Sequence, residues 1–363
     1  MILALLFLLW SVGFIVFWRF PKCEGGGSVS PVDDLSVIIP ARNEARNIGR
    51  LLSSIRSGDR LPLETIVVDD GSEDDTAAIA RDLGATIVEP GTPPAGWRGK
   101  TWACQQGGLA ARGRWLLFLD ADTWVLPNGL GLLAAETGRR RLDALSLAPY
   151  HETSRCYEQF SAIFNLTTCM GVGAFAVWDS PESPGGLFGP CLLIDREIYR
   201  KVGGHEQVRG EILEHMSLAP VLRAAGARLA CLAGRGVIHT RMYPDGWYSL
   251  IEGWTKAFAA GAAKTSGIRL SLVVIWIFGS LLPLLGLALI PWMGWHLGIW
   301  GVAYPAFVIQ WWVFLQRIGR FSVWTSFFYP VVLVIFFGVF GRSFLLRIFG
   351  REVVWKGRSI SSI

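Results

Sequence analysis

Residues 115–122, WLLFLDAD, join a short apolar run to the carboxylates of Asp120 and Asp122. A run of five apolar residues predicts a buried strand, and the acidic residues mark its end. Two earlier segments have the same form, an apolar run followed by polar residues: residues 35–47 and 63–75. The repetition of this pattern decides the fold.

Helical patterns follow these strands, with Leu51, Leu52 and Ile55 after the first of them. The predicted strands are residues 35–40, 63–68, 85–88 and 115–119, and the predicted helices include residues 76–83 and 99–111. Strands that alternate with helices predict an α/β fold with a mainly parallel sheet. Ligands of such sheets bind beyond the carboxyl ends of the strands, so the polar residues at 41–44, 69–75 and 120–122 should share one edge.

Other parts of the chain are apolar enough to enter a bilayer. Over the whole chain, 52% of the residues are hydrophobic and only 17% are charged, which is unusual for a wholly soluble protein. Residues 1–20 predict an N-terminal transmembrane anchor, followed by a linker at 21–34. A cleaved signal peptide is the alternative, but no basic residue precedes the apolar run. Arg19 and Lys22 follow it, which predicts a cytoplasmic catalytic domain by the positive-inside rule.

Residues 268–342 predict further transmembrane helices, with candidate spans at 270–290, 297–315 and 323–340. Residues 343–363 form a basic tail, either cytoplasmic or interfacial. With a cytoplasmic catalytic domain, three full spans would place this tail outside, whereas its positive charge indicates the inside. One segment could therefore be re-entrant or lie flat, near Pro330. The net charge of +5 comes largely from residues near these segments, which indicates a lipid bilayer rather than nucleic acid as partner.

The apolar stretch at residues 160–178 is interrupted by Asn165, Thr167 and Thr168. If it crossed the membrane, Asp122 and Glu214 would face opposite compartments. We therefore expect an interfacial or partly buried helix, which could let a cytoplasmic site receive a lipid-like acceptor from the bilayer.

Asp120 and Asp122 lie on the turn after a strand, where both could bind a divalent metal, Mg or Mn, that is shared with a diphosphate. Such a metal stabilises the charge on a leaving nucleoside diphosphate. Asp70 could accept a hydrogen bond from a nucleobase, and Lys100 at a helix start could bind phosphate. Residues 40–44 could be an ordinary loop, but they are placed to meet a nucleotide at the same edge.

Four segments, in this order, resemble family-2 glycosyltransferases: VIIPARNE at 37–44, VVDDGS at 67–72, Gly-Lys at 99–100 and FLDAD at 118–122. The resemblance implies a GT-A fold over residues 35–265, a uridine or similar nucleotide-sugar donor, a divalent metal and inversion at the anomeric carbon. It also implies donor-binding residues, namely Pro40, Ala41, Arg42, Glu44, Asp70, Lys100 and Asp120, with Asp122 and Asp120 on the metal.

The family commonly has a Glu-Asp pair after a Gly-Gly segment, and its aspartate removes the acceptor proton. Here Gly203-Gly204 is followed by Glu214-His215, so histidine stands at the aspartate position. The resemblance implies that one of this pair is the general base, and the sequence leaves the choice open. Glu211 is a third candidate, and a merely polar helix face is the alternative.

The segments GPCLLI at 189–194, ILEHMSLA at 212–219 and WTKAF at 254–258 resemble bacterial carotenoid glycosyltransferases that act on diaponeurosporenoate-type acceptors. This implies transfer of a hexose, glucose from UDP-glucose, by a multi-pass enzyme of the cell membrane. Trp254 and Lys256 lie where processive relatives carry an acceptor motif, Q-x-x-R-W, which is not intact here. The alternatives are a hopanoid, sterol, ceramide or diacylglycerol acceptor, a polysaccharide synthase, and a silent nucleotide-sugar-binding membrane protein. The sequence does not predict an oligomeric state.

Overall fold

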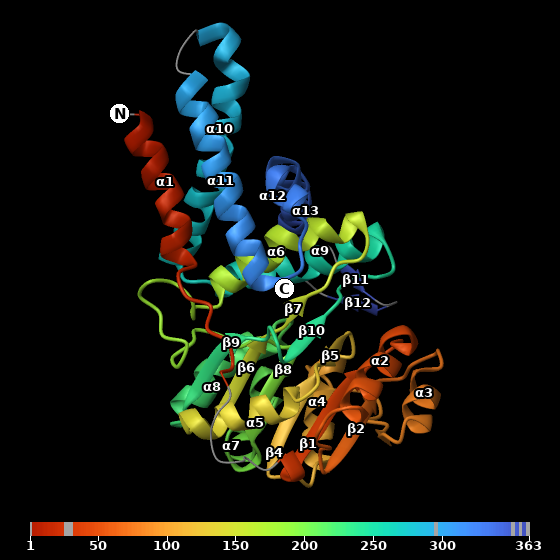
Figure 1. Cartoon of the computed structure of the whole chain (residues 1–363). Coiled ribbons are helices and arrows are strands. Elements are labelled where there is room, and N and C mark those ends of the chain that lie inside the picture. Colours follow the sequence, from red (N-terminus) through yellow and green to blue (C-terminus); the bar gives the residue numbers. More distant parts are fainter. Residues whose placement is uncertain (1, 25–31, 294–296, 350–352, 356–357, 361–363) are drawn as a thin grey trace. The chain divides into compact units, whose positions relative to one another are not determined.

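The computed structural model describes residues 2–24, 32–293, 297–349, 353–355 and 358–360 (Figure 1). The chain divides into two compact units. The sheet unit comprises residues 21–151 and 180–241, and the helical unit comprises residues 1–20, 152–179 and 242–363. Part of the expected linker, residues 25–31, lies outside the described residues.

The sheet unit is built on a seven-stranded sheet, in the order β3-β2-β1-β4-β8-β6-β9 (Figure 1). Its strands are β1 (Leu35–Ala41), β2 (Glu64–Asp69), β3 (Thr86–Val88), β4 (Trp115–Leu119), β6 (Ala144–Ala148), β8 (Cys191–Asp195) and β9 (Leu229–Ala233). All neighbours pair in parallel except β8, which is antiparallel to both β4 and β6. The predicted mainly parallel α/β sheet is confirmed.

Both faces of this sheet are covered, which explains the near-continuous apolar runs in its central strands. Successive side chains of a strand point to opposite faces. In β4, Leu117 and Leu119 join the core that includes α2 (Ala45–Arg56), while Leu116 and Phe118 join the core that includes α4 (Gly99–Ala110) and α8 (Glu214–Ala224).

The sheet unit also contains a smaller sheet, in the order β5-β10-β7. Its strands are β5 (Thr123–Val125), β7 (Tyr150–His151) and β10 (Ile238–Thr240), and the further helices of the unit are η1 (Val32–Asp34), α3 (Thr76–Asp82), α5 (Gly129–Arg140), α7 (Arg196–Lys201) and η3 (Glu206–Val208). Because β5 begins three residues after Asp120, the small sheet fixes the far end of the acidic turn.

Helix α4 approaches the sheet closely at Gly107. A Cβ atom at this position would clash with Cγ2 of Ile38 in β1 and would lie 2.9 Å from Cγ2 of Val68 in β2. The glycine therefore sets the distance between the sheet and the helix whose first turn carries Lys100.

We predict that Gly107→Ala lowers the free energy of unfolding of the sheet unit by about 1–3 kcal/mol, because the added methyl group overpacks a filled core. Thermal unfolding of the detergent-solubilised protein measures the change. Gly49→Ala is the matched control: its Cβ would lie 3.5 Å from Cγ2 of Ile79, an ordinary contact, and alanine favours a helix interior. Equal losses in both variants would contradict this view of Gly107.

The helical unit contains three helices long and apolar enough to cross a membrane, among the residues that are described: Gly267–Leu289, Gly298–Ile318 and Tyr329–Leu346. They belong to α10 (Gly267–Met293), α11 (Leu297–Ile318) and α13 (Tyr329–Ile348). The expected third span, 323–340, is wrong in its start, since a separate short helix, α12 (Val323–Phe327), comes first. Pro330 occupies the first turn of α13, where its missing N–H costs nothing.

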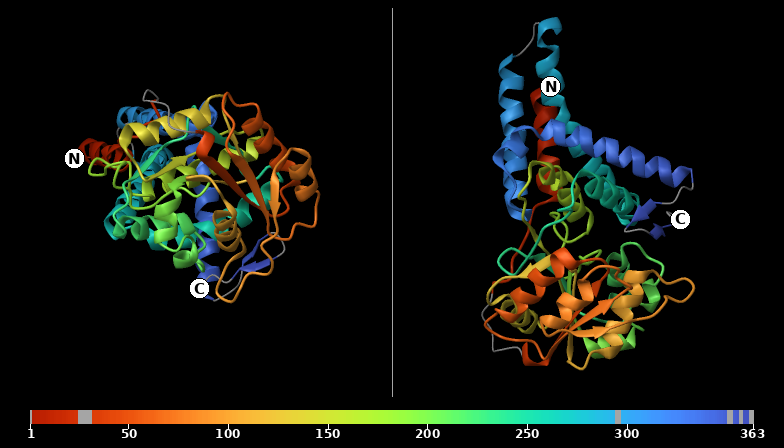
Figure 2. Two further views of the ribbon diagram at one scale, coloured as in Figure 1. Left: turned by 90° about the horizontal axis from the view of Figure 1, so that it is seen from below. Right: turned by 90° about the vertical axis from the view of Figure 1, so that its right-hand side faces the viewer.

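Helix α1 (Ile2–Val16) has 15 residues, fewer than the about 20 that a full span requires. It lies beside α10 and α11 (Figure 1; Figure 2, right). Gln310 joins the three helices: its Oε1 accepts a hydrogen bond from Nε1 of Trp276 (2.8 Å), and its Nε2 donates to the carbonyl of Trp10 (2.6 Å). A polar group inside apolar helices is thus satisfied within the protein.

The compact units differ from the expected domain limits of 35–265. The stretch expected at 160–178 forms η2 (Cys156–Ser161), α6 (Ala162–Gly171) and an irregular segment, and it packs with α9 (Trp247–Lys264), α10 and α13. These segments therefore belong to the helical unit. Within the expected tail, α13 continues to Ile348, and β11 (Val353–Trp355) pairs with β12 (Arg358–Ile360).

Candidate functional site

The loops after β1 and β2 are joined by hydrogen bonds into one polar wall. The N–H of Asn43 donates to Oγ of Ser72 (3.0 Å), and the N–H of Glu73 donates back to Oδ1 of Asn43 (2.8 Å). The N–H of Glu44 donates to Oγ1 of Thr76 (2.8 Å). Asn43 has a φ of 51°, a left-handed conformation that asparagine tolerates. Each loop therefore holds the shape of the other.

The expected nucleotide-binding residues lie on this wall. Pro40 and Ala41 are the last residues of β1, and the N–H of Asp70 donates to the carbonyl of Ala41 (2.9 Å). Asp70 is buried, and this burial raises the pKa of its carboxyl despite the opposing charge of Arg42. The structure thus brings Arg42 and Asp70 together at the carboxyl ends of β1 and β2.

Lys100 connects two carboxylates from distant parts of the chain. Its Nζ lies 2.8 Å from Oδ1 of Asp120 and 3.0 Å from Oε1 of Glu214. Lys100 comes from the first turn of α4, Asp120 follows β4, and Glu214 is the first residue of α8. The expected donor-binding and catalytic residues therefore share one ion-pair network.

The protonation states of this network follow from its charges. Burial alone would lower the pKa of Lys100, but Asp120 and Glu214 outweigh it and hold that pKa well above its ordinary value. Burial alone would raise the pKa of Glu214, but the Lys100 ammonium and the adjacent His215 lower it well below its ordinary value. Lys100 is therefore an ammonium and Glu214 a carboxylate at neutral pH.

His215 lies behind Glu214, with Nδ1 3.1 Å from Oε1 of Glu214 and its side chain only 1% exposed. Gly189 borders the ring: a Cβ atom at Gly189 would lie 2.9 Å from Nδ1 of His215. Gly189 reaches this edge because β8 is antiparallel and pairs Cys191 with Leu119, so its first residue lies where β4 ends. The sequence indicates no site role for Gly189, since the antiparallel direction of β8 cannot be predicted from it.

His205 forms a second buried layer behind His215, with ring centroids 5.4 Å apart in an edge-on arrangement. Its Nδ1 lies 2.7 Å from the hydroxyl of Tyr199, and its backbone N–H donates to Oε1 of Gln105 (2.7 Å). Burial, assisted by His215, lowers the pKa of His205 from 6.5 to about 3. Its place directly after Gly203-Gly204 was the signal that could have identified it.

We predict that the protein loses stability as the pH falls from 6.5 towards 3. In this range the unfolded chain protonates His205 and the folded chain does not, so protons favour unfolding, by up to about 1.4 kcal/mol for each pH unit. Denaturant unfolding at a series of pH values measures the slope. His205→Phe should make the slope shallower. A remainder comes from His151, whose pKa burial also lowers to about 3, and at the acid end of the range from carboxyls such as Glu136 and Asp143, whose pKa is lowered by arginine partners. An unchanged slope in the variant would refute this assignment.

Asp122 is half-buried on the turn between β4 and β5, and its carbonyl accepts a hydrogen bond from Oγ1 of Thr240 (3.1 Å). Within the described ranges, no group of three or more His, Cys, Asp or Glu side chains could hold a metal by itself. Asp120 and Asp122 supply two carboxylates, and Mg²⁺ is commonly bound by one or two carboxylates together with substrate phosphates. The pair therefore fits a divalent cation that binds with a diphosphate.

The remaining expected site residues lie apart from this network or in the other unit. Glu211 is half-buried and interacts with Arg98, the residue before α4. Trp254 and Lys256 are on α9 of the helical unit. Trp254 is 5% exposed and stacks on Phe164 with ring centroids 4.8 Å apart, which gives it a packing role in that unit.

Comparison with known proteins places these features in a family. A family model described as "Glycosyl transferase family 2" matches residues 36–203. A 4,4'-diaponeurosporenoate glycosyltransferase of Staphylococcus aureus (strain MRSA252) is 36% identical over 333 residues, which cover 90% of this chain and 88% of the relative. Its namesake from strain USA300 is 35% identical with the same coverage.

A solved structure supports the fold. The mannosyltransferase of Pyrobaculum calidifontis, determined in complex with GDP-Man and Mn²⁺, matches with a TM-score of 0.50 and 17% identity. The match covers 88% of this chain and 97% of that one. At this identity the likeness concerns the fold alone.

Proposed function

Since the chain belongs to glycosyl transferase family 2 and is a glycosyltransferase of the GT-A fold, we propose that it transfers a hexose to a carotenoid carboxylic acid. One observation carries the proposal: the identity of 36% extends over 90% of the chain to a relative named for transfer to diaponeurosporenoate. That name denotes a carboxylate of the carotenoid class, an apolar molecule with one acidic end.

The donor in this proposal is a nucleotide-sugar, with UDP-glucose the first to test. Its nucleoside lies against the wall formed by residues 40–44 and Asp70, whose loops fix each other by hydrogen bonds. Its diphosphate lies towards Asp120 and Lys100, where the ammonium adds positive charge. The reaction inverts the anomeric carbon, as the resemblance to the family implies.

Asp122 and Asp120 hold a divalent cation, Mg²⁺ or Mn²⁺, together with the donor diphosphate. The bound cation supplies stabilisation of the negative charge that develops on the leaving diphosphate. The supporting observation is the chemistry of the pair: two carboxylates on a short turn fixed at both ends by strands β4 and β5.

The acceptor reaches the enzyme from a bilayer in which the protein is a multi-pass membrane protein. Supporting this, the helical unit exposes large apolar side chains on α1 and α10, including Phe7, Leu8 and Phe278. The sheet unit lies on the cytoplasmic side, because Arg19 and Lys22 follow the first apolar helix.

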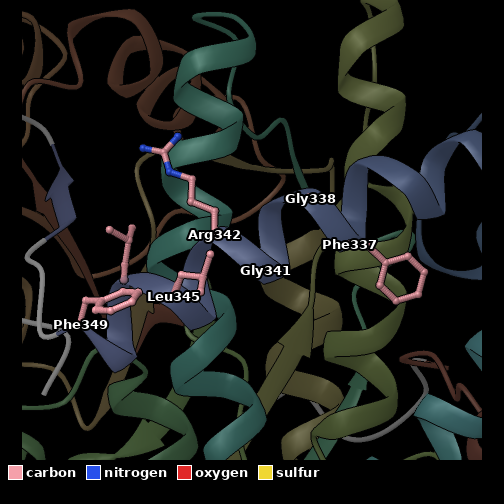
Figure 3. Close-up of a pocket in the computed structure, with 7 residues that line it drawn as sticks. Phe337, Gly338, Gly341, Arg342, Leu345 and Phe349 are labelled. Atoms are coloured by element: carbon pink, nitrogen blue, oxygen red, sulfur yellow. The ribbon is translucent and has the colours of Figure 1, made fainter.

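An open groove of about 670 Å³ along α13 offers a place for an apolar molecule. Phe337, Leu345 and Phe349 give it an apolar lining, Gly338 and Gly341 leave room beside the helix, and Arg342 adds one cation (Figure 3). Ligand sites of this size are mainly apolar, with a few polar groups that orient the ligand. The groove suits the apolar part of a carotenoid acid, whose acidic end must be free to react.

We predict that Asp122→Asn reduces transfer at least about 100-fold, because the side chain loses the negative charge that holds the cation. Membranes that contain the protein are incubated with radiolabelled UDP-glucose, Mn²⁺ and carotenoid acids, and label in the organic phase is counted. EDTA should abolish transfer, and added Mn²⁺ or Mg²⁺ should restore it.

Asp59→Asn is the matched control, because Asp59 is an exposed aspartate outside the site. It should transfer as well as the native chain. Label in a hopanoid, ceramide or diacylglycerol fraction would replace the acceptor in this proposal, and label in a polymer would indicate a polysaccharide synthase. Donor binding without any transfer would indicate a silent nucleotide-sugar-binding protein.

A further inference from the structure

A general base in sugar transfer must reach the acceptor oxygen, within hydrogen-bonding distance of the proton that it removes. The base position of family 2 is occupied here by Glu214 and His215, so the surroundings of these two side chains decide whether either can remove a proton.

Glu214 is held by its neighbours. Its side chain is 5% exposed, and Oε1 lies 3.0 Å from the Lys100 ammonium and 3.1 Å from Nδ1 of His215. A carboxylate in such an ion pair is a weak base, and proton uptake would leave Lys100 without one of its two partners. The contacts therefore favour a fixed anion.

His215 is enclosed by protein atoms. His205 packs edge-on against its ring, Gly189 borders Nδ1, and both ring nitrogens are buried without a hydrogen-bond partner within the described residues. With its side chain 1% exposed, the ring presents no nitrogen to an acceptor as large as a carotenoid. Its short distance to Glu214 instead orients the carboxylate that holds Lys100.

We propose that this enzyme transfers sugar without a general base, and that Glu214 and His215 are positioning residues for Lys100. The inference rests on the proposed function, because its nucleophile is an acceptor carboxylate that is already ionised. One carboxylate oxygen forms a bond to the anomeric carbon, the bond from that carbon to the diphosphate oxygen breaks, and its electron pair stays on the diphosphate. No proton moves, and the products are an acyl hexose and a nucleoside diphosphate.

The charged and titratable groups around the pair come from several elements. They are Arg98, Lys100 and Cys104 at or on α4, Asp120 after β4, Tyr199 on α7 and His205 before η3. Lys100 is the cation in direct contact with Glu214. The pair thus connects α8 to the residue that faces the donor.

The test compares two simple acceptors, decanoate and decanol, with the purified full-length protein in detergent, UDP-glucose and Mn²⁺. Release of nucleoside diphosphate is measured from pH 6.5 to 8.5. Decanoate should stimulate release about 100-fold or more over decanol, because an alcohol without a base loses the usual gain from proton removal. The rate with decanoate should be flat over this range, since a carboxyl group is ionised throughout it.

Glu214→Gln and His215→Gln should raise the KM for the donor about tenfold, the equivalent of one charge-assisted hydrogen bond, and should keep the flat pH profile. Glu214→Asp, which retains a carboxylate, should recover part of this loss. Glu206→Gln, a change at an exposed carboxylate, should behave as the native chain. Thermal unfolding verifies that each variant is folded.

A rising limb near pH 6.5 in the native chain that disappears in His215→Gln would overturn the inference, as would decanol used as well as decanoate. If decanoate accepts sugar but carotenoid acids do not, the proposed acceptor fails and the inference stands. If neither decanoate nor any carotenoid acid stimulates release, both fail.

Discussion

The site depends on one ammonium between two carboxylates. Lys100 makes contacts of 2.8 Å and 3.0 Å with Asp120 and Glu214, and through them it joins α4, the end of β4 and the start of α8. A buried carboxylate without a partner is strongly destabilising, so Glu214 is tolerated inside the protein only because Lys100 is there. The close approach of α4 to the sheet at Gly107 supports this helix, and hence its first turn, at the sheet edge.

Much of this arrangement could be predicted from the sequence, because it follows from patterns within short segments. Strands β1, β2 and β4 are short apolar runs that end in polar residues, and parallel strands bring those ends to one edge. Asp70 and Asp120 therefore lie where the pattern predicts, directly after β2 and β4, whereas for Lys100 the sequence indicated only the start of a helix. The family resemblance added Glu214 and His215.

The contacts that the sequence could not predict join residues far apart in the chain. Nothing near Lys100 in the sequence indicates that it pairs with Glu214. Strand β8 has the same apolar composition as its neighbours, so its antiparallel direction, which brings Gly189 to His215, could not be read from it. The unit limits also differ, because α6 and α9 precede the predicted C-terminal spans in the sequence but pack with α10 and α13.

Histidine at position 215, where the family commonly has aspartate, is consistent with the proposed carboxylate acceptor. An enzyme whose acceptor is an alcohol must keep a base where the oxygen arrives, whereas a carboxylate arrives ionised. The chain then retains a carboxylate at position 214 for its charge and can bury a histidine next to it. The apolar surface of the helical unit fits an acceptor whose only polar end is the reacting one.

The bond between the sugar and the acceptor in the product tests most directly whether the acceptor is a carboxylate. Labelled product formed from UDP-glucose and membrane lipids would be extracted into organic solvent and treated with mild alkali, which cleaves a sugar ester but leaves an ordinary glycoside intact. Transfer to an acceptor carboxylate predicts that alkali returns the label to the aqueous phase as free glucose. Label that stays with the lipid, or that is released as glucosylglycerol, would show an alcohol acceptor and contradict this chemistry.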